Sequence, residues 1–171
     1  MKILDLLEAF NTEQDLKWVK GSQSRYYTEF DIGTESYFIE VHLFDVNDKK
    51  VSNIIFGKFD SSGAGTTKAT PSKKPIRVFS VVINGVKKLL GQLGVDAAVY
   101  VAKDGDDAFE GRASLYKTLG THLAKSTGWN LYVRDGRDTS ATIISKLPLS
   151  KDDIQYIKDN IQSTNFLKKK K

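Results

Sequence analysis

The sequence predicts a single α+β domain in which helices flank a mixed β-sheet. Three runs with strand character follow one another between residues 25 and 59, as expected for an antiparallel meander. An apolar helical stretch then separates the third run from a fourth strand. Because a helix between two strands implies a crossover connection, the sheet is expected to be mixed. The full predicted order is α-βββ-α-β-α-ββ-α.

The first half of the chain supplies an opening helix and the meander. Apolar residues at helical spacing predict a short helix over residues 3–10. The strands are expected at residues 25–32, 36–44 and 51–59. The middle strand alternates, with Tyr37, Ile39, Val41 and Leu43 on one face and Phe38, Glu40, His42 and Phe44 on the other. Apolar residues on both faces indicate that this strand lies inside the sheet.

Residues 60–75 consist largely of Ser, Gly, Thr, Lys and Pro and offer almost nothing to bury. We expect this stretch to lack regular structure, which in a compact domain points to mobility or to a function. Pro75 suits the first turn of the next helix, because no intrahelical N–H donor is needed there. Gly94 is the expected stop of that helix.

The second half of the chain is expected to hold a strand, a helix, a hairpin and a final helix. The strand is predicted at residues 95–102 and the helix at about 111–126. The hairpin pairs residues 129–134 with residues 139–146. Ser150 followed by Asp153 resembles a capping box with Asp in place of Glu, and it predicts the start of a helix that runs through Ile161.

Length and composition favour one soluble domain and exclude cysteine chemistry. The chain has 171 residues, of which 40% are hydrophobic and 27% are charged. A domain of this size can bury most of its apolar surface without disulfides or metals. It contains no Cys, which excludes a disulfide framework, a thiolate metal site and a cysteine nucleophile.

The basic charge of the chain is concentrated at its C-terminus. The net charge is +5, and the four lysines at 168–171 account for all but one unit of it. We therefore expect a single domain over residues 1–167 and a basic tail over residues 168–171. An acid at Asp5 interrupts what would be a signal peptide, and no apolar run approaches a membrane span. The expected location is the cytoplasm.

The order of elements and one helix motif resemble the GNAT acyltransferase superfamily. Residues 112–120, which read RASLYKTLG, are similar to the alanine, leucine-tyrosine and glycine helix of that family. The resemblance covers residues 25–146. It implies a GNAT-like sheet and acetyl-CoA as the cofactor, with the pyrophosphate on backbone N–H groups between a strand and the next helix. It also implies that Tyr116 is the general acid toward the departing thiolate.

The pyrophosphate signature of the family is Gln or Arg, two residues, Gly, one residue, then Gly or Ala. Residues 73–80, at the start of the predicted helix, contain no such pattern. Gly63 and Gly65 lie more than ten residues upstream of that helix. The combination of a Lys/Thr loop, a Val-Phe-Ser-Val-Val helix start and an Arg-x-x-Leu-Tyr helix also resembles small uncharacterised proteins encoded by tailed bacteriophages.

Tyr116 and Glu40 are the catalytic candidates if the chain is an acyltransferase. A neutral, positioned phenol can protonate a leaving group, and Glu40 on the middle strand would be the general base. The alternative for Tyr116 is a ring that packs on the sheet. His42 and His122 are isolated, and the acids Asp104, Asp106 and Asp107 lack the spacing of a calcium loop, so no metal site is expected.

Two lysine-rich segments are candidates for binding an anion such as nucleic acid. In the loop before the second helix the charges are Lys68, Lys73, Lys74 and Arg77; in the tail they are Lys168, Lys169, Lys170 and Lys171. The loop lacks the spacing of a nucleotide P-loop. A lysine tail neutralises phosphates independently of sequence. The alternatives are an exposed linker and a frayed, solvated terminus.

The sequence therefore supports three hypotheses. The first is a non-catalytic binding protein, phage-encoded and acting in the host cytoplasm, that engages a nucleic acid or a host protein and needs no cofactor. The second is a divergent acyltransferase that uses acetyl-CoA, with Tyr116 as acid and the main-chain amides after Phe59 polarising the thioester. The third is a virion or assembly component.

Overall fold

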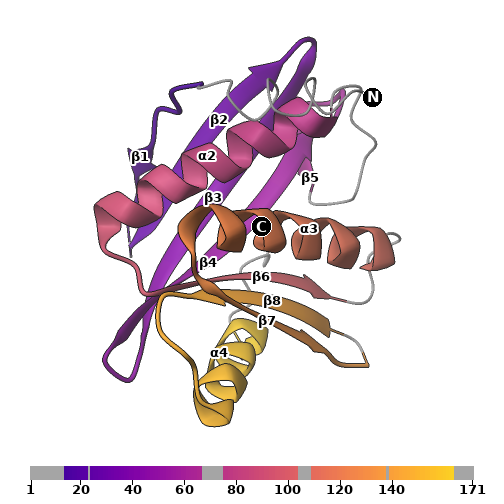
Figure 1. The fold of residues 1–171 in the computed structure, drawn as a ribbon. Coiled ribbons are helices and arrows are strands. Elements are labelled where there is room, and N and C mark those ends of the chain that lie inside the picture. The colour runs from indigo at the N-terminus through magenta and orange to yellow at the C-terminus, as the bar shows by residue number, and fades with distance from the viewer. Residues whose placement is uncertain (1–13, 23, 67–74, 104–108, 138, 164–171) are drawn as a thin grey trace.

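The protein is an α+β domain with an eight-stranded mixed sheet and helices on both faces (Figure 1). A computed structural model describes residues 14–22, 24–66, 75–103, 109–137 and 139–163. The strand order is β1-β2-β3-β4-β6-β8-β7, and β5 pairs with β4 beside this path. The predicted helix at 3–10, the acidic turn at 104–107 and the tail at 168–171 lie outside the described residues.

The predicted meander is confirmed. β2 (Arg25–Ile32), β3 (Glu35–Val46) and β4 (Lys49–Phe59) are consecutive antiparallel strands, and β3 lies between the other two. The tight turn between β2 and β3 contains Gly33 at a φ of 64°, a conformation that suits a residue without Cβ. The predicted alternation of β3 also holds, because Tyr37, Ile39 and Val41 all join one hydrophobic core, which includes residues of helix α2 (Pro75–Leu93).

Two short strands were not predicted. β1 (Val19–Lys20) extends the sheet beyond β2, and β5 (Gly65–Thr66) folds back on the end of β4. The expectation that residues 60–75 lack structure is therefore wrong for the part up to Thr66. Gly65 makes this hairpin possible, because a Cβ at that position would lie 3.0 Å from the Phe38 ring.

The predicted crossover is also present. α2 (Pro75–Leu93) leads to β6 (Ala97–Lys103), which pairs in parallel with β4 and makes the sheet mixed. α2 ends at Gly94, which has a φ of 61° and is the predicted stop. Figure 1 shows α2 lying across the meander.

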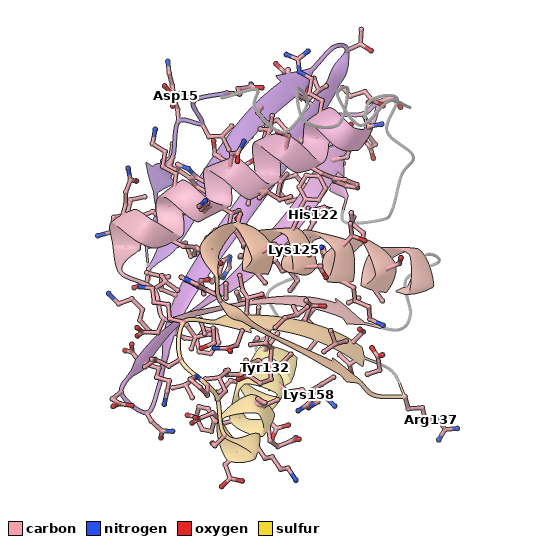
Figure 2. All side chains as sticks on the ribbon, viewed as in Figure 1. Asp15, His122, Lys125, Tyr132, Arg137 and Lys158 are labelled. Carbon is pink, nitrogen blue, oxygen red and sulfur yellow. The ribbon has the colours of Figure 1, made fainter. Side chains whose placement is uncertain are left out.

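The C-terminal half completes the sheet and covers both of its faces. α3 (Phe109–Thr127) lies over β6, β8 (Thr139–Ser145) and β7 (Asn130–Asp135) (Figure 1). α4 (Lys151–Ser163) packs on the opposite face, where Ile154, Ile157 and Ile161 join residues of β6 and β8 in a second core. Tyr132 of β7 also reaches this side, and its hydroxyl accepts the Leu149 N–H at 3.0 Å (Figure 2).

The predicted capping box at the start of α4 is confirmed. The Asp153 N–H donates to Ser150 Oγ at 3.0 Å, and the Ser150 N–H donates to Asp153 Oδ2 at 3.4 Å. These reciprocal bonds satisfy donors that would otherwise be free at a helix N-terminus. Asp153 also accepts Asn47 Nδ2 at 3.0 Å, which ties α4 to the turn between β3 and β4. None of the helices in the described ranges combines the length and apolarity needed to cross a membrane.

Candidate functional site

Strands β4 and β6 diverge near the centre of the sheet. They pair in parallel only from Val51 with Ala97 to Asn53 with Val99. Beyond these residues β4 continues between β3 and β5, whereas β6 continues along β8. Figure 1 shows the two strands leaving this point in different directions. We call this divergence the β4–β6 gap.

On the side of α2 and α3, buried aromatic side chains lie where the β4–β6 gap opens, directly after the last pair of Asn53 with Val99. Tyr100 of β6 is fully buried, and Tyr116 of α3 is 3% exposed. Their ring centroids are 5.4 Å apart with the planes tilted by 32°. Both rings belong to the same core as Ile54 and Phe56 of β4. Residues of both strands that border the gap are thus buried in one hydrophobic core.

The hydroxyl of Tyr100 has an unusual environment. It is buried, and among the described residues it has no hydrogen-bond partner. Burial raises the pKa of Tyr100, and the neighbouring Tyr116 raises it further. The phenol is thus held neutral in an apolar setting, as expected for a ring that fills space.

Main-chain amides that follow β4 donate hydrogen bonds within a turn. Asp60 Oδ1 accepts the N–H groups of Ser62 at 2.9 Å and Ala64 at 3.0 Å, and the Gly63 N–H donates to the Asp60 carbonyl at 3.0 Å. The Asp60 N–H in turn donates to the Ala64 carbonyl at 2.9 Å. These four donors are among the amides after Phe59 that the acyltransferase hypothesis would use to polarise a thioester, and all four are bonded within the turn.

Glu40 lies on the other face of the sheet from Tyr116. Its neighbours Ile39 and Val41 point into the core under α2, so Glu40 points away from that core. Its carboxylate is half-buried and lies 3.5 Å from His42 Nε2. The hydrogen bond with His42 lowers the pKa of Glu40, although burial opposes this shift. The structure therefore does not bring the two catalytic candidates together.

Of the predicted anion-binding residues, the structure describes Arg77. It lies in the first turn of α2 and is exposed. Lys68, Lys73, Lys74 and Lys168–Lys171 lie outside the described residues. His122 is half-buried on α3 (Figure 2). Within the described ranges, no group of three or more His, Cys, Asp and Glu side chains could hold a metal ion.

Sequence reasoning missed a cleft at the end of the sheet where β2 turns into β3. It has a volume of about 820 Å³ and is lined by residues of two hairpins, among them Glu29, Glu35, Lys58, Phe59 and Asp60. We call it the acidic cleft. Its sequence signal is a set of acids within and beside the predicted strands, and pairing between strands is needed to bring them together.

The acidic cleft contains one largely buried ion pair. Lys58 Nζ lies 2.6 Å from Glu35 Oε1, with 18% and 11% of the two side chains exposed. The Tyr37 hydroxyl donates to the other oxygen, Glu35 Oε2, at 2.9 Å. Burial makes this pair sensitive to the loss of either partner, because the remaining charge would be left without compensation.

One aromatic ring, that of Phe59, lines the acidic cleft and belongs to a row of stacked rings. Phe59 is half-buried and packs against Phe38 with a centroid distance of 5.4 Å. Phe38 stacks in turn on Tyr27 at 6.4 Å. The Tyr27 hydroxyl donates to Glu29, and partial burial together with this acid raises the pKa of Tyr27. The cleft thus combines carboxylates with an aromatic surface.

Comparison with known proteins identified no relative. No protein-family model matches the chain, and neither a curated protein sequence nor a solved structure is significantly similar to it.

Proposed function

We propose that this chain is a non-catalytic binding protein that uses a GNAT-like scaffold to engage a nucleic acid or a host protein. The observation that carries the proposal is the burial of the side chains that border the β4–β6 gap, where Tyr100 is fully buried against Tyr116. Buried rings that pack to interior density leave no room for a pantetheine arm. We therefore assign the fold to recognition of a partner by its surface.

The strand–helix–strand unit supports the GNAT-like part of the proposal. β4, α2 and β6 follow one another, and the two strands are parallel and diverge after three residue pairs. A divergence of this kind is where the family holds its thioester. The helix with the Leu-Tyr motif, α3, follows directly and brings Tyr116 to the same gap.

Three features argue for binding over acyl transfer. The amides of Asp60, Ser62, Gly63 and Ala64 donate within the turn. Tyr116 is 3% exposed, whereas a general acid must reach the leaving group. Glu40 lies on the opposite face, and its lowered pKa makes it a weak base. A divergent acyltransferase stays the second candidate, because Tyr116 borders the gap.

Titration calorimetry with short DNA, short RNA and candidate host proteins at low salt tests the proposal. We expect the protein to bind one of these partners. We expect no binding of acetyl-CoA at millimolar concentration. The melting temperature should therefore not change when acetyl-CoA is added, since a ligand that binds only the folded state raises it. Acyl transfer that slows in Tyr116→Phe while binding persists would establish the second candidate instead.

A further inference from the structure

We infer that the acidic cleft binds a basic segment of a partner protein, with arginine or lysine side chains held between Glu29 and Asp60. The inference rests on the proposed binding function and specifies a protein, not a nucleic acid, as the partner. It is carried by three properties of the cleft: its uncompensated charge, its aromatic side and its size.

The described residues that line the cleft carry a negative charge after internal pairing. Among them Lys58 is the single cation, and Glu35 neutralises it at 2.6 Å. Glu29 and Asp60 have no cation partner among the described residues, and both are exposed. The two remaining carboxylates therefore attract a cationic ligand and repel a phosphate backbone.

Hydrogen bonds to one carboxylate oxygen of Asp60 favour its charged form and leave the other oxygen for a ligand. Its Oδ1 accepts the Ser62 N–H, the Ser62 hydroxyl at 2.6 Å and the Ala64 N–H. The hydrogen bond from the Ser62 side chain is the main cause that lowers the pKa of Asp60. No described residue donates to Oδ2, and Asp60 is exposed.

Glu29 and Phe59 complete the recognition surface. One oxygen of Glu29 is bonded to the Tyr27 hydroxyl, which orients the carboxylate and leaves the second oxygen for a ligand. Phe59 supplies a ring beside these acids. A guanidinium group stacks on such a ring while it donates to a carboxylate, and the stem of the side chain covers apolar surface.

The size of the cleft favours a peptide over a small ion. A volume of about 820 Å³ lies in the range of clefts that bind extended organic ligands, and a single cation would fill little of it. Strand pairing holds both sides of the cleft, since β2 pairs with β3 up to Ile32 with Glu35 and β5 pairs with β4 at Lys58 and Phe59. A site that is already ordered loses little entropy on binding.

A fluorescent peptide with two arginines separated by one glycine, acetylated and amidated at its ends, is a suitable probe. Anisotropy titration at low salt should show saturable binding to the full chain. The double variant Glu29→Gln/Asp60→Asn should bind about tenfold more weakly, because two exposed charge contacts are lost while the hydrogen bonds to Tyr27 and Ser62 can persist.

Two controls make the test specific. Asp45→Asn/Asp48→Asn removes the same charge from exposed sites at the opposite end of the β3–β4 hairpin, and it should bind the peptide like the parent protein. A peptide with citrulline in place of arginine has the same shape without the charge and should not bind. Equal binding of both peptides, or equal losses in both double variants, would overturn the inference.

The outcome is distinguishable from failure of the proposed function. If no arginine peptide binds but a nucleic acid or a whole protein does, the inference about the acidic cleft is wrong and the binding function stands. If acetyl-CoA binds and is turned over, the proposed function itself is wrong, whatever the peptide does.

Discussion

Replacing Tyr100 by Phe should stabilise the protein, although most substitutions in a core destabilise it. The ring of Tyr100 is fully buried and its hydroxyl has no partner among the described residues. A buried hydroxyl without a hydrogen bond costs about 1–3 kcal/mol relative to water. Removing the oxygen leaves only a small void beside Tyr116, so the net gain should be about 1 kcal/mol.

The assay is urea unfolding followed by circular dichroism, with a thermal melt as a second readout. A gain of about 1 kcal/mol in a chain of this length should raise the melting temperature by about 2–4 °C. The slope of the denaturant curve should not change, since the surface exposed on unfolding is the same.

Tyr132→Phe is the matched control, because it also removes a hydroxyl oxygen, but one that accepts a hydrogen bond. The Tyr132 hydroxyl accepts the Leu149 N–H at 3.0 Å, so its loss should destabilise the protein by about 1 kcal/mol. The two variants should therefore shift the unfolding midpoint in opposite directions. A loss of stability in Tyr100→Phe would refute the reasoning, since it would mean that the Tyr100 hydroxyl is hydrogen-bonded in a gap that is not dry.

The remaining predictions concern the packing of α3, the cap of α4 and acid stability. Gly120→Ala should cost about 1–3 kcal/mol in urea unfolding, because its Cβ would lie 2.4 Å from Thr142 Cγ2. Gly91→Ala, where a Cβ meets nothing within 4 Å, should instead add about 0.5–1 kcal/mol, and equal effects of the two would contradict the packing. Ser150→Ala should cost about 1 kcal/mol through loss of the helix cap, and an unchanged midpoint would show that the cap contributes nothing. Burial raises the pKa of Asp153, but hydrogen bonds from Ser150 and the charge of Lys49 lower it by more, so the net shift is downward from the ordinary value of 3.8. The ionised Asp153 therefore stabilises the fold above pH 3.8, and this contribution is lost as the pH falls through the lowered pKa. Asp153→Asn should therefore flatten the acid limb of a plot of unfolding free energy against pH, and a parallel curve would count against this assignment.

Local patterns in the sequence predicted the elements whose structure is set locally. The alternation along residues 36–44 predicted both faces of β3, and Ser150 with Asp153 predicted the cap of α4. In each case the residues that determine the structure are neighbours in the chain.

The features that matter for function depend on contacts between distant residues. The divergence of β4 from β6 follows from pairing with β3 on one side and β8 on the other, which no local pattern encodes. The hairpin at Gly65 depends on close approach to Phe38. The RASLYKTLG motif placed Tyr116 on a helix, but only packing against Tyr100 shows that its ring is buried.

The most direct test of the central claim is a crystal structure of the protein grown with millimolar acetyl-CoA. The account predicts that the Tyr100 and Tyr116 rings remain in contact, with no density between β4 and β6. Density for a thioester carrier between those strands, with the two tyrosines moved apart, would contradict it.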